Sequence, residues 1–311
     1  SLPHARPMVK LHIVLARCSS SLEDARSGWY TEGLHRLEMN ANSGHIFVYE
    51  ACTCADDLMP SKRHRPTWGV TINCVPNIGY EAGIYLRHLL AMRQSGTAFA
   101  DTTFFLPTTL EHHVDLSVCP FSCRKCHAID SDEVLAQLRQ RAIQYGYIGL
   151  GMSYRDDIMR SGDPCNKQVV RWMHHALFDA IAVQTPTNLA ATMNAVFVLS
   201  NTSIYEAFNK RASVIERAAR LVGADINNNS SSNAPYHYSA STRHLSHLYE
   251  GACARHPDLA PPDEPEKAAT LRSRRKLEAI GMEMLWHVLF GAGPMLPTCQ
   301  APCVTWWQME V

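Results

Sequence analysis

The sequence predicts an α/β fold in which helices flank a mostly parallel central sheet. Short apolar or β-branched stretches alternate with amphipathic helical stretches, the order typical of parallel sheets. The hydrophobic content of 46% with 19% charged residues is enough for a full-sized core. We find no internal repeat, so residues 1–311 are predicted to form a single domain, with residues 225–267 as a loop excursion rich in Asn, Ser and Pro.

Each element is predicted from the spacing of its apolar residues. The predicted strands are, in order, Val9–Leu15, His45–Tyr49, Trp68–Cys74, Thr102–Leu106 and Ala195–Ser200. The predicted helices are Tyr80–Met92, Asp132–Tyr145, Ile204–Val222 and a long final helix, Ala268–Phe290. The β-branched and aromatic stretch Thr102–Leu106 is typical of a central strand, and Gly291 suits the end of the final helix.

The most informative stretch is the turn Pro76-Asn77-Ile78-Gly79 that opens the helix Tyr80–Met92. Backbone N–H groups at a helix N-terminus and the helix dipole favour an anionic group such as a diphosphate, so Asn77 and Gly79 are candidate binding residues. Glu81 follows in the first turn. It could bond a sugar or ribose hydroxyl or act as a base, or it could simply stabilise the helix dipole.

A possible metal site follows the predicted strand Thr102–Leu106, in the sequence Glu111-His112-His113-x-Asp115. Ligands bind at the C-terminal ends of strands in open α/β sheets. Imidazoles with carboxylates can hold a transition metal or Mn²⁺, and His287 could join His112 and His113 if the final helix returns to this edge. The alternatives are a polar surface loop and, as a third function, a metal-dependent hydrolase built on this cluster.

The cysteines and the charge indicate the location and the partners. Eleven cysteines, together with sequons at Asn201, Asn228 and Asn229, favour a secretory-pathway lumen or an extracellular location. The group Cys119, Cys123, Cys126 and His127 has a spacing that suits structural zinc, but in an oxidising compartment disulfides are the simpler reading.

A formal net charge of zero argues against a nucleic-acid partner. The sequence contains no run of eighteen apolar residues, so we predict no membrane span in this chain. The chain begins at Ser1 and could have lost a signal or an anchor.

Several islands of sequence are similar to one known family. They are Leu11–Ser20, Asn77-Ile78-Gly79-Tyr80-Glu81-Ala82 with Tyr85-Leu86, Phe104–Leu106 with His112-His113, Ala195–Ser200, and Leu285-Trp286-His287-Val288-Leu289-Phe290-Gly291. In this order they resemble the uncharacterised fungal and bacterial family named domain of unknown function 3431. The islands span most of the chain, and the ordered set is more specific than any one of them.

The same order resembles glycosyltransferases of the GT-A fold, which implies a single Rossmann-like domain that transfers a sugar from a nucleotide-sugar donor to a glycan or protein acceptor. The resemblance implies that the loop with Arg17 and Ser19 meets the nucleotide and that Asp156 or Asp157 deprotonates the acceptor. The alternative for these two aspartates is that they are ordinary solvated residues of a surface loop. The sequence departs from the GT-A pattern because Pro107-Thr108-Thr109 stands where Asp-x-Asp would hold Mn²⁺. The alternative is therefore a non-catalytic carbohydrate-binding or structural protein of the same shape.

Overall fold

The structure is a computed structural model of the chain. It describes residues 10–19, 30, 32–39, 41, 43–53, 67–76, 79–107, 126–128, 132–149, 154–155, 164–178, 191–192, 196–222, 279, 281–283, 285–290 and 303–305.

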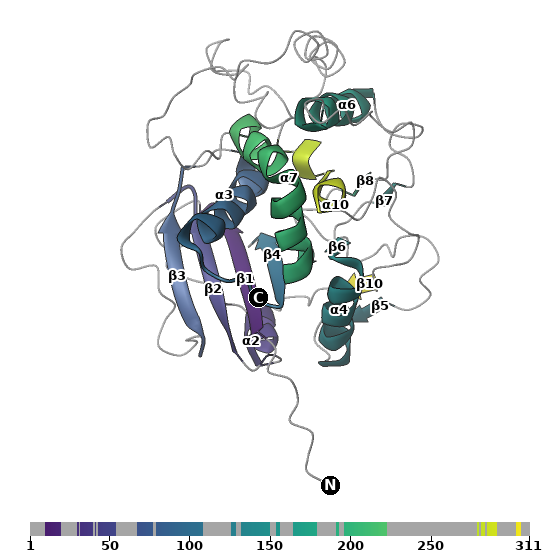
Figure 1. Cartoon of the computed structure of the whole chain (residues 1–311). Helices are drawn as coiled ribbons and strands as arrows, with labels where there is room; N and C mark the ends of the chain where they lie inside the picture. The colour runs from purple at the N-terminus through teal and green to yellow at the C-terminus, as the bar shows by residue number, and fades with distance from the viewer. Residues whose placement is uncertain are drawn as a thin grey trace.

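A six-stranded, mostly parallel sheet forms the centre of the fold (Figure 1). Its strands are β1 (Lys10–Arg17), β2 (Ser43–Glu50), β3 (Gly69–Cys74), β4 (Thr102–Pro107), β6 (Tyr147–Gly149) and β9 (Phe197–Ser200). Their order across the sheet is β3-β2-β1-β4-β9-β6. The first four strands are parallel, and β9 runs antiparallel to both of its neighbours. Two small two-stranded sheets pair β5 (Cys126–Ala128) with β10 (Cys303–Thr305) and β7 (Tyr154–Arg155) with β8 (Ala191–Thr192).

Helices cover both faces of the sheet because successive side chains of each strand point to opposite sides. One face carries α3 (Tyr80–Ser95) and α7 (Asn201–Leu221), which lie in front of the strands in Figure 1, together with α6 (Pro164–Phe178) and α10 (Trp286–Leu289). The other face is covered by α2 (Glu32–Met39) and α4 (Asp132–Tyr145).

An aromatic cluster forms the core on the α3 face. The ring of Tyr85 in α3 lies 5.1 Å from that of Phe105 in β4 and 5.5 Å from that of Phe197 in β9. Trp286 of α10 packs on Phe197 at 5.0 Å. The guanidinium of Arg217 in α7 donates hydrogen bonds to the last carbonyls of α6, which ties this layer together.

The α/β fold and the mostly parallel sheet confirm the sequence prediction, and the five predicted strands and the helices beginning at Tyr80 and Asp132 are present. The prediction of one continuous final helix is wrong at Leu285. This residue forms a turn with φ −112° and ψ 2° before the short helix α10. Beyond this turn the Trp286 and Phe290 rings are buried in the core and stack on one another at 6.0 Å. The predicted loop 225–267 lies outside the described residues.

Candidate functional site

The order of the strands places a switch point between β1 and β4. From β1 the chain adds β2 and then β3 on one side, and then crosses back through α3 to add β4 on the other side of β1. In open α/β sheets the crossovers diverge at such a point, which leaves a ligand-binding crevice outside the carboxyl ends of the strands. The carboxyl ends of β1, β2 and β4 at this edge are Arg17, Glu50 and Pro107.

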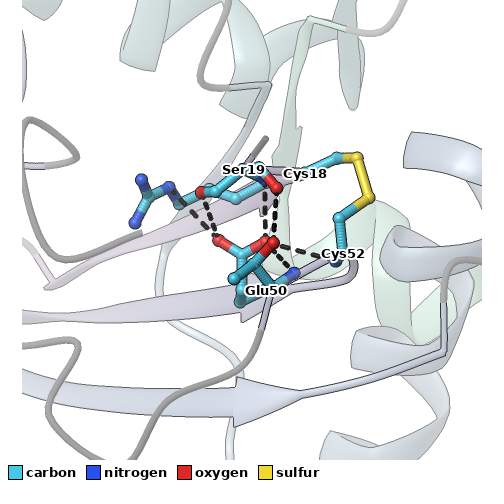
Figure 2. The surroundings of a disulfide bond; sticks show 6 residues. Cys18, Ser19, Glu50 and Cys52 are labelled. Carbon is cyan, nitrogen blue, oxygen red and sulfur yellow. Dashed lines mark hydrogen bonds and ion pairs between the residues drawn. A yellow bond between two sulfur atoms is a disulfide. The ribbon is translucent and has the colours of Figure 1, made fainter. Parts of the chain in front are cut away.

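A buried carboxylate, that of Glu50, organises this edge (Figure 2). The Ser19 amide donates to Glu50 Oε1 at 2.9 Å, and the Ser19 hydroxyl donates to Oε2 at 2.7 Å. The amides of Cys52 and Thr53 also donate to Oε1, at 3.2 and 3.3 Å. Glu50 Oε2 lies 3.7 Å from Arg17 Nε in an ion pair. The loops that follow β1 and β2 are thus held together by one side chain.

The carboxylate of Glu50 is held in its ionised form. Burial alone would raise its pKa, but hydrogen bonds from Ser19, Cys52 and Thr53 outweigh burial, so the pKa of Glu50 lies below its ordinary value. Only 1% of Glu50 is exposed. A buried carboxylate with several donors is a rigid feature, and it fixes where the chain leaves β1.

A disulfide between Cys18 and Cys52 links the same two loops (Figure 2). Cys74, the last residue of β3, is disulfide-bonded as well. The ends of three neighbouring strands therefore carry disulfide-bonded cysteines. The predicted disulfide bonding is confirmed in this part of the chain, and the group Cys119, Cys123, Cys126 and His127 has no described side chains.

The start of α3 lies at the same edge, because α3 follows the carboxyl end of β3. Gly79 is the N-cap, with φ 73° in the left-handed region that glycine adopts most readily. A Cβ at Gly79 would lie 2.3 Å from the carbonyl oxygen of Val222, so this residue packs directly against the end of α7. A ligand cannot approach Gly79 from that side. Asn77 lies outside the described residues.

Glu81 in the first turn of α3 has a second carboxyl near it. Glu283 is buried, and burial together with the charge of Glu81 raises the pKa of Glu283 to about 8. Both carboxylates also act on the buried Tyr85 one turn further along α3, whose pKa is raised first by burial and then by their charges. A buried carboxyl whose pKa is raised toward neutral pH, beside a second carboxyl, is a pattern that general acid–base chemistry uses.

The other predicted site residues are not brought together in the described part of the chain. His287 lies in α10 with none of its surface exposed, and its ring is 6.4 Å from that of Tyr147 in β6. His112, His113, Asp156 and Asp157 lie outside the described residues. Across the described ranges no three His, Cys, Asp or Glu side chains form a group that could hold a metal ion.

Sequence reasoning missed two acidic residues of this region. Glu50 stands directly after the predicted strand His45–Tyr49, so its place at a strand end was a usable signal. Glu283 gave no local signal, because its proximity to Glu81 depends on how α3 and the chain around residue 283 pack.

Comparisons with known proteins return no match among protein-family models, curated proteins or solved structures. No helix in the described ranges is long and apolar enough to cross a membrane.

Proposed function

We propose that this chain is a glycosyltransferase-like enzyme of the secretory pathway that binds a nucleotide-sugar donor at the carboxyl edge of the sheet. The observation that carries the proposal is the switch point between β1 and β4. A crevice outside the carboxyl ends of parallel strands is the usual place for a nucleotide in folds of this kind. The resemblance to the GT-A glycosyltransferases supports the same class of ligand, and the Cys18–Cys52 disulfide supports an oxidising compartment.

In this proposal the loop after β1 receives the nucleotide, and Glu50 positions that loop. Ser19 is held by two hydrogen bonds to Glu50, and Arg17 is paired with the same carboxylate. Both residues therefore act mainly by shaping the edge. Arg17 brings positive charge to a place where a diphosphate would lie, although Glu50 offsets part of it.

Glu81 is the candidate base of the proposed reaction. It lies one turn before Tyr85, whose ring packs on Phe105 near the carboxyl end of β4, so the start of α3 is beside the switch point. Glu283 shares the environment of Glu81 and carries a raised pKa. A protonated Glu283 cannot itself accept a proton, so we assign the base role, taking the proton of an acceptor hydroxyl, to Glu81.

The proposal keeps Mn²⁺ as a possible cofactor, but no step of the mechanism uses it. The described residues offer no set of ligands for it, and two of the predicted ligands, His112 and His113, lie outside them. His287, the third, is enclosed in the core beside Tyr147. We therefore derive no step through a metal ion.

Thermal denaturation with a panel of uridine, guanosine and cytidine nucleotide sugars, with and without Mn²⁺, tests the proposal. A donor at a hundred times its dissociation constant stabilises the folded state by about 2.7 kcal/mol. The variant Glu81→Gln should keep this stabilisation and lose donor hydrolysis or transfer. Glu206→Gln, on the exposed side of α7, is the matched control and should keep both.

A second candidate is the non-catalytic binding or structural protein of the same shape. Specific contacts favour it: Ser19 and Arg17 are engaged by Glu50, and Gly79 is packed against Val222. If no member of the donor panel stabilises a chain whose near-ultraviolet circular dichroism shows an intact fold, this second candidate replaces the enzyme.

A further inference from the structure

Three histidines from three elements gather between α3 and the sheet, away from the carboxyl edge. His12 of β1 and His45 of β2 are register partners, so they stand side by side on the face that α3 covers. Their rings lie 5.2 and 4.5 Å from the ring of Phe47, and the ring of His88 in α3 lies 4.7 Å from the same ring. We call His12, His45 and His88 the histidine cluster.

Few acceptors are available to the histidine cluster. His88 has none of its surface exposed, and its Nδ1 lies 3.0 Å from the hydroxyl of Tyr49. Its Nε2 and the Nδ1 of His12 are buried and have no hydrogen-bond partner among the described residues. His45 Nε2 lies 2.7 Å from the hydroxyl of Thr71. An added proton would thus place a charge where little can solvate it.

The charged groups around the cluster also disfavour protonation of its imidazoles. The charges of His45 and Lys10 act on His12, and the charges of His12 and His45 act on His88. The charge of Arg87 in α3 acts on Tyr49, the hydrogen-bond partner of His88. Among the described residues these charged neighbours are all basic. Burial first and these neighbours second lower the pKa of His12 to about 4 and that of His88 to about 3, and burial lowers the pKa of His45.

We propose that the histidine cluster is an acid-sensitive latch: when its imidazoles become protonated, α3 separates from β1 and β2. Because α3 also carries Gly79 and Glu81, the separation displaces one wall of the carboxyl edge. The effect on a donor site rests on the proposed function, but the separation itself does not.

The size of the effect follows from linkage. A histidine that titrates near 6.5 when α3 is released and near 3 when it is packed, as for His88, favours release below pH 6.5. At about pH 4.5 this single residue shifts the opening equilibrium roughly a hundredfold relative to about pH 7.5. His12 adds a similar factor, because its packed-state pKa is about 4.

Amide hydrogen exchange of the full chain, read by mass spectrometry at the two pH values and corrected for intrinsic exchange, tests the latch. Peptides of α3 should lose roughly a hundredfold or more of their protection at the lower pH, while those of β4 lose less. The latch is overturned if α3 keeps its protection, or if α3 and β4 lose it equally. No donor is needed, so this result is independent of whether the chain is an enzyme.

Variants separate the cluster from general acid sensitivity. His12→Phe replaces the titratable imidazole by a somewhat larger aromatic ring that carries no charge. The double variant Tyr49→Phe with His88→Phe removes both members of one hydrogen bond. Each variant should recover most of the acid-induced loss of α3 protection that is due to the histidine it replaces. His35→Gln changes an exposed histidine of α2 on the other face and should behave as the unmodified chain. Equal acid-induced loss in His12→Phe, in the double variant and in the unmodified chain would refute the latch.

Discussion

Removal of the Glu50 carboxylate should destabilise the fold strongly, because one side chain satisfies four donors and one cation. Glu50→Ala leaves the Ser19 hydroxyl, the amides of Ser19, Cys52 and Thr53, and Arg17 without this acceptor. Breaking a buried ion pair by removing one partner costs about 3–5 kcal/mol. Water reaching the loops after β1 and β2 will satisfy some donors, so we expect a loss of about 3–5 kcal/mol in unfolding free energy instead of the larger sum of all contacts.

Urea denaturation without reductant measures this loss, with Ser19→Ala as the second arm of a double-mutant cycle. Ser19→Ala alone should cost about 1.5–3 kcal/mol, since its hydroxyl donates to a charged group. In the Glu50→Ala background the same change should cost almost nothing. Glu206→Ala, whose carboxylate is largely exposed, should change stability by no more than about 0.5 kcal/mol. A Glu50→Ala loss of less than about 1 kcal/mol, or additive effects, would refute the reasoning.

The pH dependence of the same variant has a definite sign. The pKa of Glu50 is lowered in the folded state, so its contribution is present above its ordinary value of 4.5 and is lost as the pH falls through the folded value. The difference in unfolding free energy between Glu50→Ala and the unmodified chain should therefore shrink in acid. A difference that grows in acid would show that the carboxylate is not stabilised by its donors.

Three further changes have expected outcomes. Gly79→Ala should lower the melting temperature more than Gly96→Ala, because both glycines have a positive φ but only a Cβ at Gly79 meets backbone, at 2.3 Å, while nothing lies within 4 Å at Gly96. Above pH 4.5, Glu283→Gln should have a larger unfolding free energy than the unmodified chain, and the difference should widen up to about pH 8. The reason is that the raised pKa of Glu283 makes the unmodified chain lose stability over that interval. Equal dependence of the unfolding free energy on pH in the two chains would contradict this. Replacing both Cys18 and Cys52 by Ser should cost about 3.8 kcal/mol in urea denaturation by the loop-entropy estimate for a separation of 34 residues, and a cost near zero would show that the edge is fixed without the disulfide.

The fold was predictable where local patterns and the buried faces agree. The strand Thr102–Pro107 is fully buried and β-branched or aromatic, so its sequence alone indicates a central strand. The helix starting at Tyr80 follows a glycine turn and has regularly spaced apolar residues. The antiparallel direction of β9 was not predictable, because an apolar stretch of four residues has no direction until its neighbours are known.

The candidate site was predictable in place more than in detail. Arg17 and Ser19 were named as site residues only through the resemblance to the GT-A glycosyltransferases, and they lie at the carboxyl end of β1. Their pairing with Glu50 depends on which strand lies beside β1 and on the register of that pair, in which Arg17 stands opposite Glu50. The pattern of β1 alone does not say which strand is its neighbour. The burial of His287 likewise depends on tertiary packing, because its ring is enclosed beside Tyr147 of β6.

Photo-crosslinking with an azido nucleotide sugar, followed by peptide mapping, tests the central proposal most directly. A donor bound at the switch point should label peptides that contain the ends of β1 and β4 and the first turn of α3, and unmodified donor should compete the label away. Saturable labelling confined to other peptides, such as those of α6, would contradict the proposed site.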